Sequence, residues 1–162
     1  VLDTTMNSLN PPVHVPLCMF NITRVLNGEE CIMFREGMPK KVLDFLMAAD
    51  EERCAVTKAA GGSPKSILEL FNSMWGVQYS NIKDLGLDNP SLGTVRLPQT
   101  PDHRFLSEDV PYGFLPLSLL GKKYGVPTPH IDLLVNAYRL LFPEHAAETG
   151  PSFDVDFGEI LR

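Results

Sequence analysis

Residues 39–60 carry the clearest helical pattern in this chain of 162 residues. Apolar side chains recur there at intervals of three and four positions, and Arg53 is the one interruption. The pair Gly61-Gly62 is a typical helix end. Shorter segments repeat the pattern, and no segment shows a convincing strand alternation. We therefore predict an all-α fold, a compact bundle of about five to seven helices.

Prolines, glycines and helix-capping residues divide the rest of the chain into helices and loops. Residues 90–103 are expected to form a loop. A first helix is expected to begin at Pro11, Pro12 or Pro16 and to end at Asn27-Gly28, another to run from Ser63-Pro64 to Trp75-Gly76, and a short one to cover 81–87. After the loop, a helix is expected to begin at Ser107 or Asp109 and to end in 121–125. Two more are expected, one from Thr128-Pro129 to the stop at Pro143 and one over 154–162.

Length and composition narrow the class of protein. The length favours a single domain over residues 1–162, and the net charge of −6 argues against a nucleic-acid partner. No apolar run approaches the roughly 20 residues of a membrane span, and the first residues lack the basic start of a signal peptide. Cys18, Cys31 and Cys54 have neither C-x-x-C nor zinc-ligand spacing, so we expect reduced thiols, no metal site and a cytoplasmic location.

Residues 104–117 mix charges, prolines and aromatic side chains in a way that suits neither a solvated loop nor a plain core helix. Two interpretations stay open. The segment could place polar groups on the wall of a cleft, or it could be a loop-to-helix junction with a surface ion pair.

His14 is the best general acid/base candidate by type, because imidazole titrates near neutrality and neighbouring prolines fix its backbone. Asp109 near a helix start could orient that imidazole, or it could simply cap the helix. Arg104 could grip a substrate carboxylate with two hydrogen bonds, or it could pair with Glu108 or Asp102.

Glu108-Asp-Val-Pro-Tyr-Gly113, with Gly125-Val-Pro-Thr-Pro129 following, resembles the C-terminal helical domain of the opine dehydrogenases, the octopine/nopaline dehydrogenase family. The segment Asn10-Pro-Pro-Val-His14 is similar to the family's Asn-x-x-x-His segment. The segments 35–37 and 50–53 are also similar, and the resemblance covers most of residues 7–142.

The resemblance implies an oxidoreductase activity. Such enzymes join an amino acid to a 2-keto acid and reduce the resulting imine with NADH or NADPH. A Rossmann domain precedes the helical domain in this family and binds the cofactor. This chain contains no Gly-x-Gly-x-x-Gly motif, so that domain is expected to be absent and the chain alone is expected to bind no cofactor.

By resemblance, His14 would be the proton donor and acceptor, and Asp109 would be its partner. Arg104 would hold the keto-acid carboxylate, while Asn10 and Trp75 would contact substrate. No cofactor-binding residue is assigned.

Two other functions stay open. The chain could be a helical interaction or dimerisation module without catalysis, and an exposed interdomain face could favour a homodimer. It could also be the helical domain of another 2-hydroxy- or phospho-acid dehydrogenase. Those relatives often rely on a lysine, whereas Lys40, Lys41, Lys122 and Lys123 lie in solvent-like runs.

Overall fold

The computed structural model describes residues 6–146 and confirms the all-α class. The helices of the described part are α2 (Asn10–Phe20), α3 (Ile22–Leu26), α4 (Lys40–Ala59), α5 (Ile67–Trp75), α6 (Ile82–Asp88), α7 (Arg104–Ser107), the π-helix η1 (Val110–Phe114), α8 (Leu115–Tyr124), α9 (Pro129–Leu141) and α10 (Pro143–Ala146). The helix expected over 154–162 lies outside the described residues.

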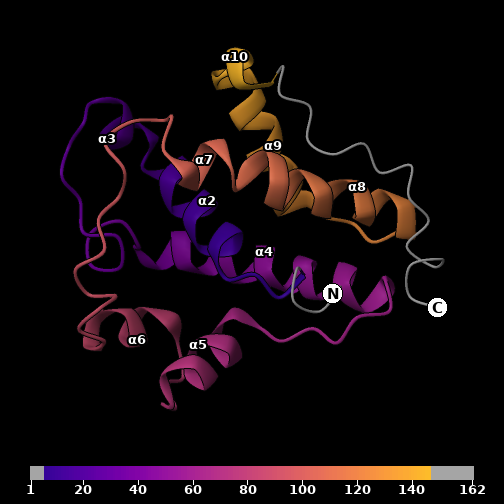
Figure 1. The fold of residues 1–162 in the computed structure, drawn as a ribbon, viewed down its shortest axis with the longest axis horizontal. Helices are drawn as coiled ribbons and strands as arrows, with labels where there is room; N and C mark the ends of the chain where they lie inside the picture. Colours follow the sequence, from indigo (N-terminus) through magenta and orange to yellow (C-terminus); the bar gives the residue numbers. More distant parts are fainter. Residues whose placement is uncertain (1–5, 147–162) are drawn as a thin grey trace.

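Helix α4 runs through the middle of the molecule (Figure 1). Helices α2, α8 and α9 pack against it, while α5 and α6 lie on its other side. The sequence predicts its bounds well, since Pro39 precedes the first helical residue and Gly61 follows the last turn with a φ of 87°. Only glycine adopts that left-handed backbone easily, so the helix ends there.

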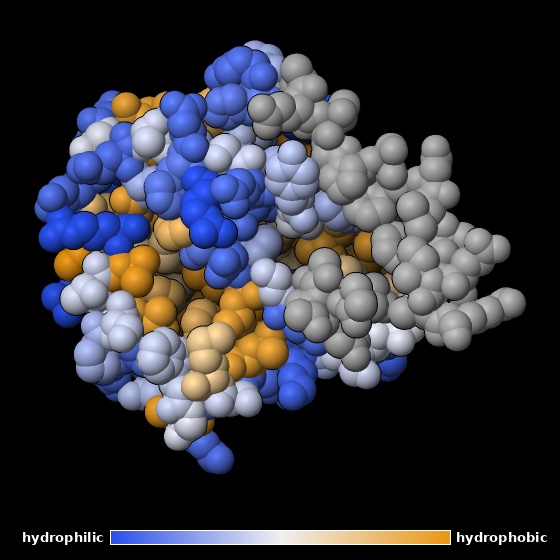
Figure 2. All heavy atoms as spheres, viewed as in Figure 1, coloured by the Kyte–Doolittle hydropathy of each residue, from blue (hydrophilic) through white to orange (hydrophobic). Residues whose placement is uncertain are grey.

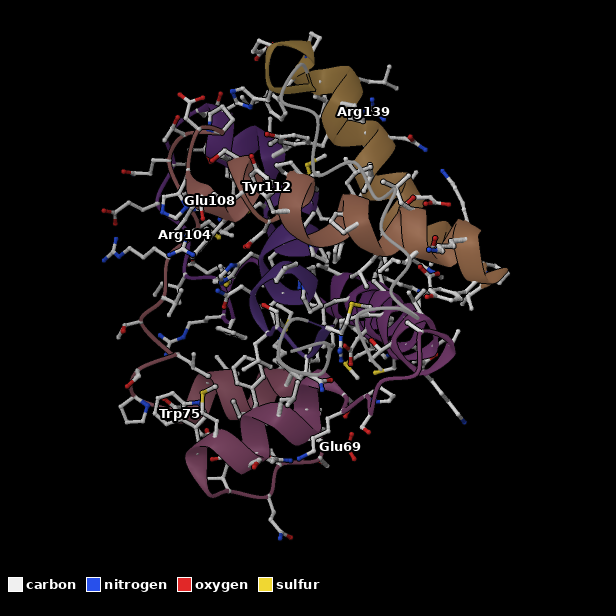
Figure 3. The ribbon with its side chains drawn as sticks, turned by 45° about the vertical axis from the view of Figure 1, so that its right-hand side comes forward. Glu69, Trp75, Arg104, Glu108, Tyr112 and Arg139 are labelled. Carbon is white, nitrogen blue, oxygen red and sulfur yellow. The ribbon has the colours of Figure 1, made fainter. Side chains whose placement is uncertain are left out.

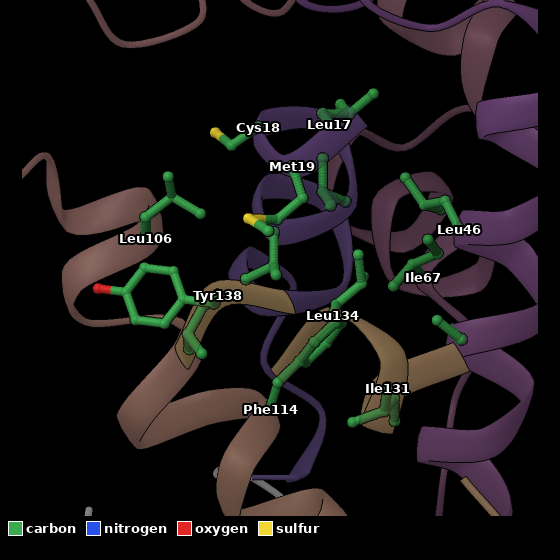
Figure 4. Close-up of a cluster of buried hydrophobic side chains, with 14 of the residues drawn as sticks. Leu17, Cys18, Met19, Leu46, Ile67, Leu106, Phe114, Ile131, Leu134 and Tyr138 are labelled. Atoms are coloured by element: carbon green, nitrogen blue, oxygen red, sulfur yellow. The ribbon is translucent and has the colours of Figure 1, made fainter. Parts of the chain in front are cut away.

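One core joins the helices around α2 (Figure 4). Its fully buried side chains come from distant parts of the chain, so burying them fixes α2, α4, α5, α7, η1 and α9 together. They include Leu17, Cys18, Leu46, Ile67, Leu106, Phe114 and Ile131.

The predicted start of α5 at Ser63-Pro64 is wrong. The helix begins after Ser66, whose hydroxyl oxygen accepts a hydrogen bond from the Glu69 backbone N–H at 3.2 Å. The Glu69 carboxylate accepts one from the Ser66 N–H at 2.7 Å in return. This reciprocal capping box satisfies two N–H groups at the helix start, which Ser63-Pro64 cannot do.

The helix predicted from Pro11 to Asn27 is divided at Asn21 into α2 and α3. The Asn21 side-chain amide donates to the backbone C=O of Leu17 at 2.8 Å and to that of Gly37 at 2.9 Å. Asn21 therefore ends α2 and ties it to the loop before α4.

The helix predicted from Ser107 or Asp109 is in fact the series α7, η1 and α8. The N–H of Asp109 donates to the C=O of Arg104 at 3.1 Å, and the N–H of Phe114 donates to the C=O of Asp109 at 3.0 Å. Both bonds span five residues. Pro111 has no N–H to give, which removes one ordinary helical bond from this turn. Turns of this wide kind are frequent at functional sites.

Arg53 interrupts the apolar stripe of α4 and is nonetheless buried. Its Nε donates to Asp50 Oδ1 at 2.7 Å, and its Nη1 donates to the Met6 C=O at 2.6 Å. Asp50 Oδ2 in turn accepts from the Ile67 N–H at 2.8 Å. This buried ion pair ties α4 to the N-terminal segment and to the first residue of α5.

Hydrophobic side chains gather over the junction between α4 and the α5–α6 pair on the face shown in Figure 2, with many hydrophilic side chains around them. Among residues 6–146, no helix combines the length and apolar character that crossing a membrane requires.

Candidate active site

His14 and Asp109 meet in the structure. His14 lies in α2, Asp109 immediately precedes η1, and these two helices pack against each other. The distance from His14 Nδ1 to Asp109 Oδ2 is 2.8 Å. The side chains are only 15% and 11% exposed, so solvent screens the contact little. Asp109 makes no side-chain capping bond to η1, so the helix-cap alternative does not describe its role.

The contact determines which nitrogen of His14 can react. An ionised Asp109 only accepts, so Nδ1 carries the donated proton. Among the described residues Nε2 has no hydrogen-bond partner, and every buried side-chain nitrogen or oxygen there has one. Nε2 therefore reaches the surface of the described part, where a bound molecule could exchange a proton with it.

Gly113 allows η1 to approach α2 this closely. A Cβ atom on Gly113 would lie 2.5 Å from Cγ of Pro11, well inside the contact distance of two carbon atoms. Glycine at this position and proline in the first turn of α2 thus bring Asp109 within reach of His14.

Two further aromatic side chains stand next to the pair. The ring of Phe105 stacks on the ring of His14, with centroids 3.5 Å apart and planes 17° apart. The rings of His103 and Phe105 make a T-shaped contact, with centroids 4.4 Å apart and planes 85° apart. Burial lowers the pKa of His103 below its usual range, and the nearby charges of His14 and Arg104 act in the same direction. A neutral His103 fits its Nδ1 accepting the Phe105 N–H at 3.3 Å.

Cys18 lies one helical turn after His14 and is fully buried. Burial raises the pKa of its thiol strongly, and the negative charge of Asp109 adds to this. Cys18 therefore stays a neutral thiol packed beside the pair, and it is no nucleophile.

Arg104 lies one turn before Asp109 but points to solvent (Figure 3). Its Nη2 is 3.5 Å from Glu108 Oε2, and both side chains are more than half exposed. The surface ion pair that the sequence allows is thus present. It is long and exposed, so an incoming carboxylate could compete for the guanidinium.

The other predicted contacts are placed differently. Asn10 is exposed at the first position of α2, four residues before His14 and so on the same helix face. Trp75 is 40% exposed at the end of α5, on the far side of α4 from α7 (Figures 1 and 3). The structure brings His14, Asp109 and the Arg104 backbone together, and it leaves Trp75 apart.

A cleft of about 720 Å³ opens beside the pair. Asp109, Glu108, Tyr112 and Pro11 are among the residues that line it, and the buried Arg53 reaches its wall. His14 is not in the lining, so Asp109 is the residue that links it to the cleft.

The sequence predictions missed Phe105, His103 and Arg53. The first two had no clear signal, because histidine is not a preferred helix cap, and the cap that His103 forms with the Phe105 N–H is seen only in the structure. Arg53 had a weak sequence signal. It is a charge on an otherwise apolar stripe, and a buried charge must be paired.

The described residues contain no group of three or more His, Cys, Asp or Glu side chains that could hold a metal ion. They pair strands only at one isolated bridge, between Ile32 and Arg96. Because a Rossmann site needs a parallel sheet, residues 6–146 contain no Rossmann site.

Comparisons with known proteins agree with this helical architecture. A family model described as "NAD/NADP octopine/nopaline dehydrogenase, alpha-helical domain" matches residues 1–141. An opine dehydrogenase from Arthrobacter sp. (strain 1C) is 29% identical over 136 residues. These residues make up 84% of this chain and 38% of that relative. The chain thus spans well under half the length of the relative.

Proposed function

The chain belongs to the octopine/nopaline dehydrogenase family, and we propose that it is the substrate-binding and catalytic helical domain of an opine dehydrogenase. In this proposal an amino acid and a 2-keto acid condense, and the imine is reduced at the expense of NADH or NADPH. The observation that carries the proposal is the hydrogen bond from His14 to Asp109, which leaves Nε2 without a partner among the described residues and not fully buried.

The chemistry of condensation requires such a group. The amine must lose protons before it becomes an imine nitrogen, and the carbonyl oxygen must gain protons before it leaves as water. His14 Nε2 accepts a proton from the nitrogen and returns one to the oxygen. Asp109 keeps the proton of Nδ1 in place and stabilises the imidazolium that forms in between.

Arg104 would hold the carboxylate of the keto acid. The Arg104 backbone lies one turn before Asp109, and its exposed guanidinium is engaged only by Glu108 among the described residues. A bidentate carboxylate contact is shorter and stronger than this 3.5 Å pair. Asn10 would contact the same substrate, and its position on the His14 face of α2 supports this. Trp75 has less support, since it lies across α4.

The hydride would come from a nicotinamide held by a nucleotide-binding domain outside this chain, since the described residues form no Rossmann sheet. The residues of this chain bind substrate and move protons. The remaining length of the Arthrobacter relative gives room for such a domain.

An activity assay with product analysis tests this function. The full-length enzyme should oxidise NADH or NADPH only when a 2-keto acid and an amino acid are both present, and mass spectrometry should find a secondary amine. The chain alone should give no oxidation. Oxidation with the keto acid alone, yielding a 2-hydroxy acid, would instead support the hydroxy-acid dehydrogenase alternative.

A further inference from the structure

The hydrogen bond to Asp109 fixes one atom of the His14 ring but leaves its plane undetermined. The ring is attached to the backbone through Cβ and is held at Nδ1, so it can still rock about the line that joins these two points, and each tilt points Nε2 in another direction. A tilt of this kind matters, because small displacements of a reacting group reduce catalysis strongly. Something else must therefore hold the plane of the imidazole.

Phe105 is the side chain in position to do so. It lies 3.5 Å from His14 between ring centroids, with the two planes nearly parallel. This is closer than most aromatic pairs, whose centroids are roughly 4.5–7 Å apart. Its π face also attracts a positive charge, so the contact favours the imidazolium that forms during proton transfer.

Phe105 is itself fixed from two sides. Its backbone N–H donates to Nδ1 of His103, and the His103 and Phe105 rings make a T-shaped contact. Its side chain also packs against the buried core, which includes its neighbour Leu106. His103, Phe105 and His14 thus form a row of three rings that begins at the start of α7 and ends at the acid/base candidate.

We propose that Phe105 is a positioning residue for His14, which holds the imidazole plane so that Nε2 points at the reacting atoms. The inference rests on the proposed function, and it goes further by assigning the orientation of His14 to an aromatic side chain on α7. Because Phe105 would act through His14 and not through substrate affinity, its loss should lower kcat and leave KM nearly unchanged.

Proton NMR of the 162-residue chain tests the geometry directly. The Cε1–H resonance of His14 should lie upfield in the native chain because the Phe105 ring current shields it. Phe105→Leu and Phe105→Met should each remove this shift, and Phe105→Tyr should retain it. Absence of the upfield shift in the native chain would overturn the proposal whatever the variants do.

The matched control is Phe45→Leu. Phe45 also contacts a histidine, His130, with ring centroids 4.7 Å apart, but on α4 and α9, away from Asp109. Removing it should leave the His14 resonance and the turnover unchanged. A change of the same size as in Phe105→Leu would mean that any lost aromatic residue has this effect.

Kinetics of the full-length enzyme complete the test. Phe105→Met should lower kcat about 10-fold with KM within about twofold, and Phe105→Tyr should stay near the native kcat. His14→Ala, measured alongside, separates the two claims. If His14→Ala keeps full turnover, the proposed function fails. If it loses turnover while Phe105→Met keeps it, only the positioning role fails.

Discussion

Asp109 Oδ2 lies 2.8 Å from His14 Nδ1 although the two residues are 95 positions apart in the sequence. The contact depends on the wide turn of η1 and on Gly113, which allows that turn to pack against Pro11. An ordinary helical turn in place of η1 would rotate Asp109 and its neighbours about the helix axis and so move the Asp109 carboxylate. The irregular backbone is thus part of how the pair is built.

Replacing Asp109 with Asn should lower kcat of the full-length enzyme by about 10–10²-fold. An amide can donate to Nδ1, which would place the remaining proton on Nε2 and block its action as a base. Steady-state kinetics check this. Asp44→Asn is the matched control, because Asp44 is an exposed carboxylate paired with Lys40 and should have no effect. Equal rates for both variants would contradict the role of Asp109.

Replacing Arg104 with Gln should raise KM for the keto acid about 10-fold, because a charge-assisted carboxylate contact is lost. The melting temperature should change little, since exposed ion pairs contribute roughly 0–1 kcal/mol. Arg96→Gln is the control, because Arg96 is also exposed and paired with a glutamate, Glu30. If both variants have the native KM, Arg104 is only a surface ion pair.

Replacing Arg53 with Met should lower the free energy of unfolding by about 3–5 kcal/mol, because the Asp50 carboxylate stays buried without its cation. Urea denaturation measures this. Lys40→Met, which breaks the exposed pair with Asp44, should cost about 0.5 kcal/mol or less. A small loss for Arg53→Met would mean that the pair does not hold α4 to α5.

The lowered pKa of His103 predicts a pH dependence of stability. The fold favours neutral His103, so its stabilising contribution is complete above the ordinary pKa near 6.5 and is lost as pH falls through the lowered folded value. His103→Ser keeps a capping oxygen but does not titrate. Between about pH 7 and 5, the native chain should therefore lose unfolding free energy more steeply than His103→Ser. Parallel curves would contradict the prediction.

Local patterns in the sequence predicted the helices well where one signal dominated. The apolar stripe and Gly61 determined α4, and Gly76 and Gly125 ended α5 and α8 in the left-handed conformation that glycine allows. The start of α5 was misjudged because two serine positions competed. Ser66-x-x-Glu69 has the sequence pattern of a capping box, but Ser63-Pro64 was preferred as the helix start.

The candidate site was predictable only in part. His14 and Asp109 were chosen by residue type and by a family resemblance, and their contact across the chain follows from tertiary packing. The π turn and the stacking of Phe105 on His14 could not be predicted, because both depend on how α2 and α7 approach each other. The burial of Arg53 likewise depends on distant partners, the Met6 C=O among them.

The central claim is that His14 moves the protons of the condensation. The most direct test is kcat of the full-length enzyme carrying His14→Ala, with an amino acid and a 2-keto acid as substrates. Circular dichroism and melting temperature should first establish that the helices remain folded. The account predicts a fall in kcat of about 10²-fold or more. A folded variant that turns over near the native rate would contradict it.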